Sequence, residues 1–384
     1  MQYFLTVSVY ILSPSCFLTC AIHIFMDQSS KRRKLKAGII GVGDISIMHA
    51  PGYKDFDRGE LYAIADINEQ LLRRREEEWQ VPKAYTDYRD LLADPEIDLV
   101  EIITPHHLHK PMVLDAATAG KHVSVQKPMS LSIREAEEMI EATRKAGVRF
   151  KVFENFVFYP PYVKAKELLD GGEIGDPLSI RFKLGTGLFG MQRQYPVTVE
   201  LWHLLEVEKG MGQAVFDDGY HKLSLAIHFI GEIDRVRGWI DRSFALVDMP
   251  AMLMWHYKDS ECLGYFDTAL SPSMYVKSNY FSADERVDIT GTKGWLSVSR
   301  CTAQLLDVPA LVMCRDGRRY LFDDLRTDWL DSFVDSCRHF VGCIIEDKDP
   351  LLTGERGKQV LQFAFAVIKA ARDHCEVKPD DIKD

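Results

Sequence analysis

The pattern of hydrophobic and polar positions divides the chain into two regions of different character. From Lys36 to Glu154, short runs of consecutive apolar and β-branched residues alternate with helical segments. Uninterrupted apolar runs of this length are typical of parallel strands that are buried on both faces. The pattern predicts strands over Lys36–Ile40, Leu61–Ala65, Leu99–Ile103, His122–Gln126 and Arg149–Phe153. Strand–helix alternation with short links predicts an α/β domain with a doubly wound parallel sheet.

The helices between these strands carry recognisable ends. Glu69–Glu78 is a charged helical run, and Pro111–Ala119 is a second helix. Ser132 and Glu135 have the spacing of a capping box, which predicts a helix that starts there and ends at Gly147.

The character changes after Asn155. Pro160 opens a short helix, and longer extended runs follow it at Leu178–Leu184, Met252–Tyr257, Leu263–Thr268, Arg286–Thr290 and Trp295–Val298. Turn residues separate these runs, which predicts a mostly antiparallel sheet. Helices are expected at Trp329–Val341 and from Thr353 through Arg372. We therefore predict an extension over 1–35, a nucleotide-binding domain over 36–155 and an α+β domain over 156–377.

Composition narrows the classes of function. The chain has 384 residues, 46% of them hydrophobic, and a formal charge of −10, which argues against nucleic acid as the main partner. Its eight cysteines are scattered, with no C-x-x-C pair and no cysteine–histidine cluster at zinc spacing. We expect reduced thiols, a cytoplasmic location and no metal site.

The first residues allow two interpretations. The segment 4–25 is largely apolar and long enough in principle to cross a membrane, and Lys31-Arg32-Arg33-Lys34 follows it. Charge that follows the apolar run is the wrong order for a secretory signal. We favour the alternative in which Met26 is the true start, and both alternatives leave the rest of the chain in the cytoplasm.

A glycine pair after the first strand is the first candidate for cofactor binding. Gly41-x-Gly43 lets the backbone approach a pyrophosphate closely, although Ser46 takes the place of the usual third glycine. Asp66 follows the second strand, where a carboxylate can accept hydrogen bonds from a ribose 2′-hydroxyl. The same carboxylate repels a 2′-phosphate, so NAD is favoured over NADP.

Two further strand ends carry polar residues. Lys127 follows the strand His122–Gln126, and Thr104-Pro105 follows another strand at the same edge of the sheet. Ligands bind outside the carboxyl ends of parallel strands, which makes Lys127 a candidate for substrate chemistry. The histidines after Pro105 lack a carboxylate or cysteine at ligand spacing, so we interpret them as a loop that borders the cofactor.

Asp217 and His221 are the candidate pair in the second domain. They are four residues apart, which places them on one face of a helix and lets the carboxylate orient the imidazole. Histidine is the natural proton acceptor near neutral pH. A helix-capping aspartate beside a core histidine is the competing interpretation. His203 and His228 lack such a partner, and we expect them to be structural.

Taken together, these segments resemble the glucose–fructose oxidoreductase, inositol 2-dehydrogenase and rhizopine-catabolism (Gfo/Idh/MocA) family. The matching pieces are Gly41-Val42-Gly43-Asp44-Ile45, Thr104-Pro105, Gly120-Lys121-His122-Val123, Lys127-Pro128, Asn155 and Asp217-x-Gly219-x-His221. The resemblance implies an N-terminal Rossmann domain, a C-terminal α+β domain with an open antiparallel sheet, NAD or NADP, and dimers or tetramers that form through that sheet.

The resemblance also implies roles for single residues. Lys127 matches the lysine of a Glu-Lys-Pro motif that contacts cofactor and substrate, and His221 matches the general acid/base, with Asp217 beside it. The cofactor contacts implied are Gly41, Gly43, Asp44, Ile45, Asp66, Thr104, Pro105, Gln126, Lys127 and Asn155. Gln126 stands where the family usually has glutamate, and His106 stands where asparagine usually follows Thr-Pro.

We expect an NAD-dependent dehydrogenase that acts on a secondary hydroxyl of a sugar, cyclitol or related polyol. Two alternatives stay open: a glycosidase that oxidises its sugar transiently with NAD, and a non-catalytic dinucleotide-binding regulator. The segment Leu188–Lys209, with Phe189, Tyr195 and Trp202, is expected to be an inserted loop that could line the pocket.

Overall fold

The structure is a computed structural model that describes residues 33–191, 213–241, 248–299, 302 and 307–383. Within it, Leu35–Asp384 forms one compact unit. The interpretations of the first 25 residues, and of Tyr195, Trp202 and His203, lie outside the described residues. Across the described residues, every helix is too short or too polar to span a lipid bilayer.

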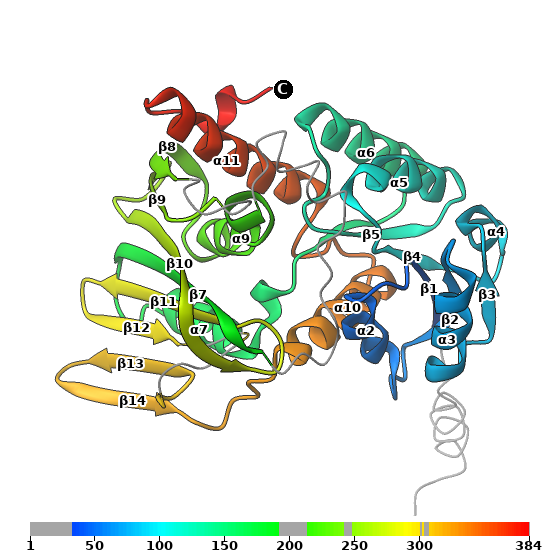
Figure 1. Ribbon diagram of the computed structural model, residues 1–384, viewed down its shortest axis with the longest axis horizontal. Coiled ribbons are helices and arrows are strands. Elements are labelled where there is room, and N and C mark those ends of the chain that lie inside the picture. Colours follow the sequence, from blue (N-terminus) through cyan, green and yellow to red (C-terminus); the bar gives the residue numbers. More distant parts are fainter. Residues whose placement is uncertain (1–32, 192–212, 242–247, 300–301, 303–306, 384) are drawn as a thin grey trace, which may run out of the picture. The chain divides into compact units, whose positions relative to one another are not determined.

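The first sheet has six parallel strands in the order β3-β2-β1-β4-β5-β6 (Figure 1). Its strands are β1 Leu35–Ile40, β2 Gly59–Ala65, β3 Lys83–Tyr85, β4 Leu99–Ile102, β5 His122–Gln126 and β6 Phe150–Phe153. The parallel α/β domain predicted from the apolar runs is confirmed. Strand β3 was missed because it has only three residues, all of them half-buried at the edge of the sheet.

The helices of this domain are α2 Ser46–His49, α3 Glu69–Trp79, α4 Tyr88–Ala93, α5 His109–Thr118 and α6 Ile133–Ala146. The predicted capping of α6 is confirmed, because the backbone N–H of Glu135 donates to Oγ of Ser132 at 3.2 Å. Gly147 ends this helix in the left-handed region, with φ of +67°. The strand order reverses between β1 and β4, and ligands bind at such a switch point in open α/β sheets.

The second sheet has eight strands in the order β14-β13-β12-β11-β7-β10-β9-β8. Its strands are β7 Pro177–Met191, β8 Ile233–Ile240, β9 Ala251–Tyr257, β10 Leu263–Ser278, β11 Ala283–Gly291, β12 Gly294–Val298, β13 Leu311–Arg315 and β14 Arg318–Phe322. Only β7 and β10 pair in parallel, so the mostly antiparallel sheet is confirmed. The start of the expected loop, Leu188–Met191, is the end of β7, and residues 192–209 lie outside the described residues.

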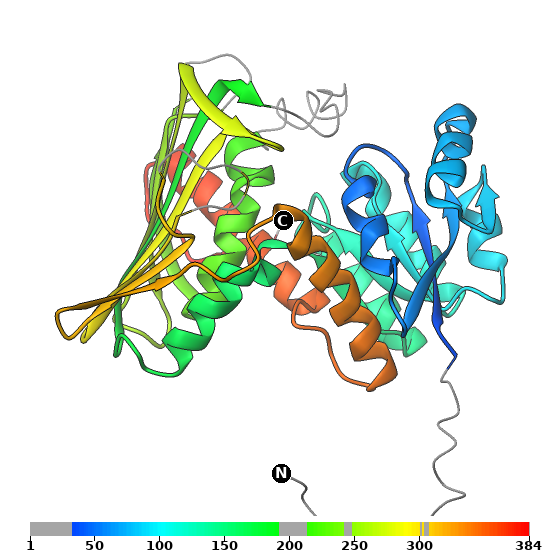
Figure 2. The same cartoon turned by 90° about the horizontal axis from the view of Figure 1, so that it is seen from below.

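Helices cover one face of this second sheet (Figure 2). They include α7 Pro160–Asp170, α9 Gly219–Phe229 and α11 Gly354–Asp373. Burial alternates along β9, with Leu253 and Trp255 buried and Met252 and Met254 exposed. A strand with one buried and one exposed face has period-two burial, so no part of the described chain packs on the opposite face.

The last two helices connect the two sheets. Helix α10, Trp329–Ile345, lies against the first domain, where the buried amine of Lys151 in β6 donates to the Ser336 carbonyl at 2.7 Å. Helix α11 holds α9, because the hydroxyl of Tyr220 donates to the Gly357 carbonyl at 3.1 Å. These contacts fix α10 on β6 of the first sheet and α9 on α11.

Candidate active site

The glycine turn after β1 is shaped by one close approach and one open position. Gly41 has φ of +91°, and a Cβ there would lie 2.4 Å from the carbonyl oxygen of Ile103. Only glycine fits such a position without strain. A Cβ at Gly43 would meet no atom within 4 Å, so space is open beside the backbone of this residue. The turn therefore fits a dinucleotide pyrophosphate at the switch point of the sheet.

Asp66 closes this turn from the end of β2. Its Oδ2 accepts the backbone N–H of Val42 at 2.9 Å, and its Oδ1 accepts that of Asn68 at 2.8 Å. The carboxylate therefore lies beside the glycine turn, where the ribose interpretation requires it. Ser46, in the position of the third glycine, is fully buried and donates to the Gly43 carbonyl at 2.6 Å, so a small residue packs there.

The three consecutive arginines of helix α3, Arg73, Arg74 and Arg75, differ in their burial. Arg73 and Arg74 are exposed, as expected of a charged helix face. Arg75 is only 7% exposed, and its Nε donates to the Val42 carbonyl at 3.4 Å, so it supports the glycine turn from below. The guanidinium of Arg75 also donates to the carboxylate of Glu78 at 2.5 Å, and this ion pair balances its charge.

Thr104 and His109 tie two strand ends together. The ring of His109 contacts the Thr104 carbonyl through Nε2 at 2.9 Å and the Pro128 carbonyl through Nδ1 at 3.1 Å. Burial lowers the pKa of His109 to about 3, so this ring stays neutral and only one of its two nitrogens donates a hydrogen bond to a carbonyl. The histidine thus fixes the loop after β4 against the loop that follows Lys127. The cofactor contacts of Thr104, Pro105, Asp44 and Ile45 stay predictions.

Gln126 is part of a buried chain of hydrogen bonds. Its Oε1 accepts the backbone N–H of Lys127 at 2.8 Å, which turns its amide nitrogen toward Nε2 of His49 at 3.0 Å. An amide N–H needs an acceptor, so Nε2 carries the lone pair and Nδ1 carries the proton. Nδ1 then donates to Glu101 at 2.5 Å, and the hydroxyl of Tyr53 donates to the other carboxylate oxygen at 2.7 Å.

This chain explains the replacement of glutamate at position 126. A glutamate has no N–H to donate, whereas the glutamine amide accepts from the Lys127 N–H and donates to the lone pair of the His49 ring.

His49, Glu101 and Cys337 form a group of three side chains whose possible metal-ligand atoms lie within 4.8 Å of one another. The separation of 2.5 Å between His49 and Glu101 is that of a hydrogen bond, and is shorter than the spacing of about 3.3 Å between ligands on one tetrahedral metal.

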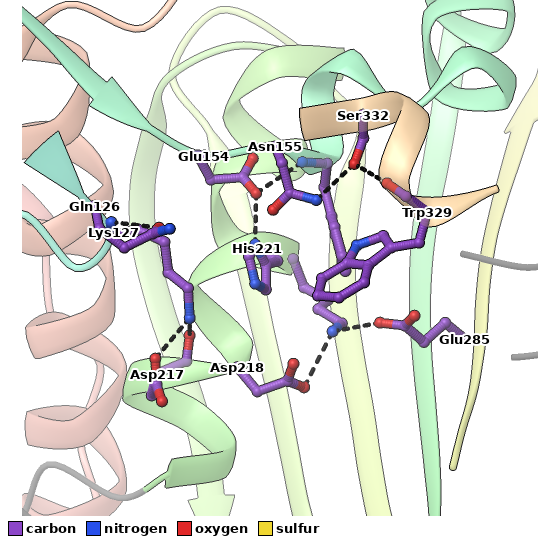
Figure 3. A network of polar contacts seen from close by, with 12 residues as sticks. Gln126, Lys127, Glu154, Asn155, Asp217, Asp218, His221, Glu285, Trp329 and Ser332 are labelled. Atoms are coloured by element: carbon purple, nitrogen blue, oxygen red, sulfur yellow. Dashed lines mark hydrogen bonds and ion pairs between the residues drawn. The ribbon is translucent and has the colours of Figure 1, made fainter. Parts of the chain in front are cut away.

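Lys127 extends from the end of β5 to the segment before α9 (Figure 3). Its Nζ donates to Oδ1 of Asp217 at 2.6 Å and to the Asp217 carbonyl at 3.0 Å. Both side chains are partly buried, with exposures of 15% and 21%. The amine of the nucleotide-binding half therefore meets the second half directly in front of the helix that carries His221.

Asp217 and His221 have other hydrogen-bond partners than the pairing expected from the sequence. Asp217 ends a π-helical turn, Gln213–Asp217, and α9 begins only at Gly219, so the two residues do not share a face of one α-helix. Nδ1 of His221 instead lies 2.5 Å from Oε1 of Glu154, which directly follows β6 (Figure 3). Sequence reasoning missed Glu154, although a carboxylate at a strand end of this edge is the same signal that singled out Lys127.

The surroundings of His221 favour its neutral form. Its ring stacks on Phe156, with the ring centroids 4.0 Å apart. Burial, followed by the charges of Lys127 and Lys222, lowers the pKa of His221 well below its usual value. Lys222 is itself paired with Glu285 at 2.6 Å and with Asp218 at 3.1 Å. A neutral imidazole between two lysines is suited to accept a proton.

The pKa of Glu154 is shifted in the opposite direction to that of His221. It is 1% exposed, and burial raises its pKa to about 7, although the backbone N–H of Phe156 and the charge of Lys127 oppose the change. The Phe156 N–H donates to Oε1 at 2.9 Å, the same oxygen that faces His221. Two groups with shifted pKa values thus lie in one contact, an arrangement that is common at functional sites.

Asn155 and His228 are held by the fold. The buried Asn155 amide donates to Oγ of Ser332 in α10 at 2.7 Å, so this side chain connects two elements of the protein. Its contact with a cofactor stays a prediction. Burial lowers the pKa of His228 to about 4, in keeping with the structural role expected for it.

The glycine turn, Asp66 beside it and Lys127 in contact with the turn before the helix of His221 are features typical of a dinucleotide-dependent oxidoreductase. Comparison with known sequences identifies the family. The Gfo/Idh/MocA oxidoreductase profile, described as an NAD-binding Rossmann fold, matches residues 35–154. The profile of the C-terminal domain of the same family matches residues 162–297. The chain belongs to the Gfo/Idh/MocA family, as the sequence motifs indicated, and the expectation of an NAD-binding oxidoreductase is confirmed.

Two dehydrogenases match over more than nine tenths of their length. Myo-inositol 2-dehydrogenase of Thermotoga maritima is 28% identical over 361 residues, which cover 91% of this chain and 99% of the relative. D-apiose dehydrogenase of Paraburkholderia graminis is 24% identical over 369 residues, 92% of each chain.

Solved structures share the architecture. A probable dehydrogenase from Thermotoga maritima superposes with a TM-score of 0.73 at 25% identity, covering 91% of this chain and all of the other. An oxidoreductase from Agrobacterium radiobacter in complex with NAD+, L-tartaric acid and magnesium has a TM-score of 0.78 at 19% identity, with 91% and 99% covered. At that identity the second likeness concerns the fold alone.

Proposed function

We propose that this protein oxidises a secondary hydroxyl of a cyclitol or sugar, and that His221 and Lys127 act on the hydroxyl. The substrate class is supported by the relatives, which are dehydrogenases of inositol and of a pentose. Bound NAD supplies the acceptor for the hydride. The residues of this chain bind the reactants, orient the hydroxyl and remove its proton.

One observation carries the proposal: the contact between Lys127 and Asp217 joins the cofactor edge of the first sheet to the turn that directly precedes the helix of His221. In this arrangement the neutral imidazole accepts the hydroxyl proton, while the amine of Lys127 donates to the same oxygen. A donor placed where negative charge develops stabilises the transition state. Asp217 holds the amine and its positive charge in place, which is the role we assign to it instead of orienting His221.

The test is turnover with a panel of inositols, aldoses, anhydrosugars and amino sugars, measured as NADH absorbance. The variant Lys127→Met should lower kcat by at least about 10³-fold, because it removes both the charge and the donor. We expect the dissociation constant of NADH, measured by fluorescence, to change by less than about threefold. Lys166→Met, in an exposed ion pair of helix α7, is the matched control and should keep wild-type turnover.

Three outcomes would contradict the proposal. Unchanged turnover in Lys127→Met removes this lysine from the mechanism. Cleavage of a glycoside with no net production of NADH favours the glycosidase. Tight NADH binding without turnover of any compound in the panel favours a regulator.

We further propose that the protein self-associates through the uncovered face of the second sheet. Large exposed apolar side chains on neighbouring strands support this, among them Trp239 of β8 at 57% exposure, Met252 and Met254 of β9, and Leu263 of β10. An apolar patch of this kind on a soluble domain is typical of an interface. Sedimentation velocity measures the self-association, and a monomer at micromolar concentration would contradict the proposal.

We also propose a cytoplasmic location, because the described cysteines are free thiols.

A further inference from the structure

The two carboxylate oxygens of Glu154, which contacts His221, have different surroundings. Oε1 of Glu154 accepts the Phe156 N–H and lies 2.5 Å from Nδ1 of His221. Oε2 is buried, and it has no hydrogen-bond partner among the described residues. A buried carboxylate oxygen without a partner is costly when the group is charged, and much less so when the group carries a proton. The surroundings of Oε2 therefore favour the protonated carboxyl more than is usual for a glutamate.

We propose that Glu154 is the positioning residue of His221, and that the single proton shared by this pair selects the direction of the reaction. With Glu154 ionised, Nδ1–H of His221 donates to Oε1, and the lone pair lies on Nε2. The imidazole then accepts the hydroxyl proton at Nε2. With Glu154 protonated, its O–H donates to Nδ1 and the ring carries its proton on Nε2, which is the form that donates to a carbonyl in the reverse reaction.

The proton balance of the oxidation closes within the pair. The O–H bond of the substrate breaks as an Nε2–H bond forms, and the hydride leaves the same carbon for NAD. The Nδ1 proton passes to Oε1 of Glu154. The carbonyl product therefore leaves a neutral ring and a neutral carboxylic acid. Before the next turnover the Nε2 proton is released to solvent and the acid proton returns from Oε1 to Nδ1, which restores the starting tautomer.

The charged neighbours of the pair set the pH at which this exchange occurs. The charged ones are Lys222 of α9, Lys127 after β5 and Lys151 of β6, and the neutral phenol of Tyr220 in α9 is a further titratable neighbour. Burial raises the pKa of Glu154 to about 7, while burial and the two facing lysines lower that of His221. The proton that is gained or lost belongs to the pair as a whole, so activity should report one apparent pKa near 7.

The inference rests on the proposed function for its kinetic part, and a second measurement needs no substrate. In protein with ¹⁵N-labelled histidine, the His221 signals are assigned by their loss in His221→Asn. In the wild type, we expect the proton to lie on Nδ1 above pH 8 and to move to Nε2 below pH 6. In Glu154→Gln this exchange should disappear, because an amide does not ionise. Glu154→Asp, which keeps an ionisable group, should restore a titration.

The kinetic part uses the best substrate of the panel. Wild-type kcat for oxidation should rise through pH 7, and kcat for reduction should fall through the same range. Glu154→Gln should lower kcat at pH 8 by roughly 10- to 100-fold, as is usual when the partner of a functional histidine is removed. The change of kcat around pH 7, which is the limb of the pH profile, should also disappear in this variant. The NADH dissociation constant should stay within about threefold. In the control Glu101→Gln the limb should keep its wild-type position.

The outcomes separate the two proposals. A His221 ring whose tautomer does not change with pH in the wild type, or changes equally in Glu154→Gln, overturns the role of Glu154. A limb at pH 7 that persists in Glu154→Gln overturns it as well. The expected NMR titration without turnover of any polyol contradicts the proposed function while it supports the shared proton. If Glu154→Gln does not fold, the wild-type titration and Glu154→Asp still decide.

Discussion

The molecule contains two buried histidine–glutamate pairs with nearly the same geometry and opposite electrostatics. In both pairs Nδ1 of the ring lies 2.5 Å from a carboxylate oxygen, and in both the glutamate is 1% exposed. His49 and Glu101 lie inside the nucleotide-binding domain. His221 and Glu154 lie where that domain meets α9.

The difference comes from the remaining oxygen of each glutamate. The second oxygen of Glu101 accepts the hydroxyl of Tyr53, and although burial opposes ionisation, the contacts with His49 and Tyr53 leave the pKa of Glu101 lowered. Oε2 of Glu154 has no described partner, and burial prevails. In this protein, the pair in which both carboxylate oxygens have partners keeps its glutamate ionised. The pair with one unpartnered oxygen can gain or lose a proton near neutral pH, and we call such a pair adjustable.

The largest effect expected from this contrast is on stability. Glu101→Gln leaves His49 and Tyr53 facing a neutral amide, and should lower the free energy of unfolding by about 2 to 4 kcal/mol. Glu154→Gln at pH 8 should lower it by less than about 1 kcal/mol, because the ionised carboxyl it removes is poorly satisfied there. Urea unfolding of both variants at pH 8 measures the difference. Equal losses would mean that the two pairs are energetically alike.

The pH dependence of unfolding sharpens the comparison. The folded-state pKa of Glu154 is about 7, above its ordinary value of 4.5, so its contribution to stability is complete below pH 4.5 and is lost as pH rises through 7. The stability of Glu154→Gln relative to wild type should therefore increase between pH 5 and pH 8, by on the order of 2 to 3 kcal/mol.

The matched variant should behave in the opposite way. Glu101 has a lowered pKa, so its contribution is present at neutral pH and is lost as pH falls below about 4.5. The deficit of Glu101→Gln should therefore be largest near pH 7 and shrink in acid. His221, whose pKa is lowered, adds a loss of wild-type stability below pH 6.5, but both variants keep that residue. Parallel profiles for the two variants would contradict the assignment.

Local sequence patterns were enough to predict most of the fold. The apolar runs identified five of the six strands of the first sheet, and the strand-end rule identified Lys127 and Asp66. These features depend on neighbouring residues along the chain. Strand β3 was missed because three residues are too few to show a period.

The contacts of the site depend on residues far apart in sequence. The spacing of Asp217 and His221 predicts a pair only if one α-helix is continuous, and α9 begins at Gly219. Glu154 reaches its partner across 67 residues, and Gln126 reaches His49 across 77. No local pattern encodes such contacts, so the sequence alone does not show that Gln126 donates a hydrogen bond to His49.

The smallest effect tests that required donor. In Gln126→Glu, a carboxylate oxygen faces the lone pair of His49 unless the ring gains a second proton. With that proton, the ring would donate to two carboxylates, Glu101 and the new one. We therefore expect a loss of about 1 kcal/mol in unfolding free energy at pH 8 and a smaller loss at pH 6, where the proton is easier to supply.

Thermal unfolding at the two pH values measures this effect, and Gln126→Leu is the control. Leucine has neither a donor nor a charge, so its deficit should be the same at pH 6 and pH 8. If the stability deficit of Gln126→Glu were also the same at pH 6 and pH 8, the protonation of His49 would not depend on the residue at position 126. If the deficit instead fell toward pH 6, the Rossmann-domain pair would have become adjustable through one added charge, because its ring, like that of His221, would then exchange a proton with its surroundings.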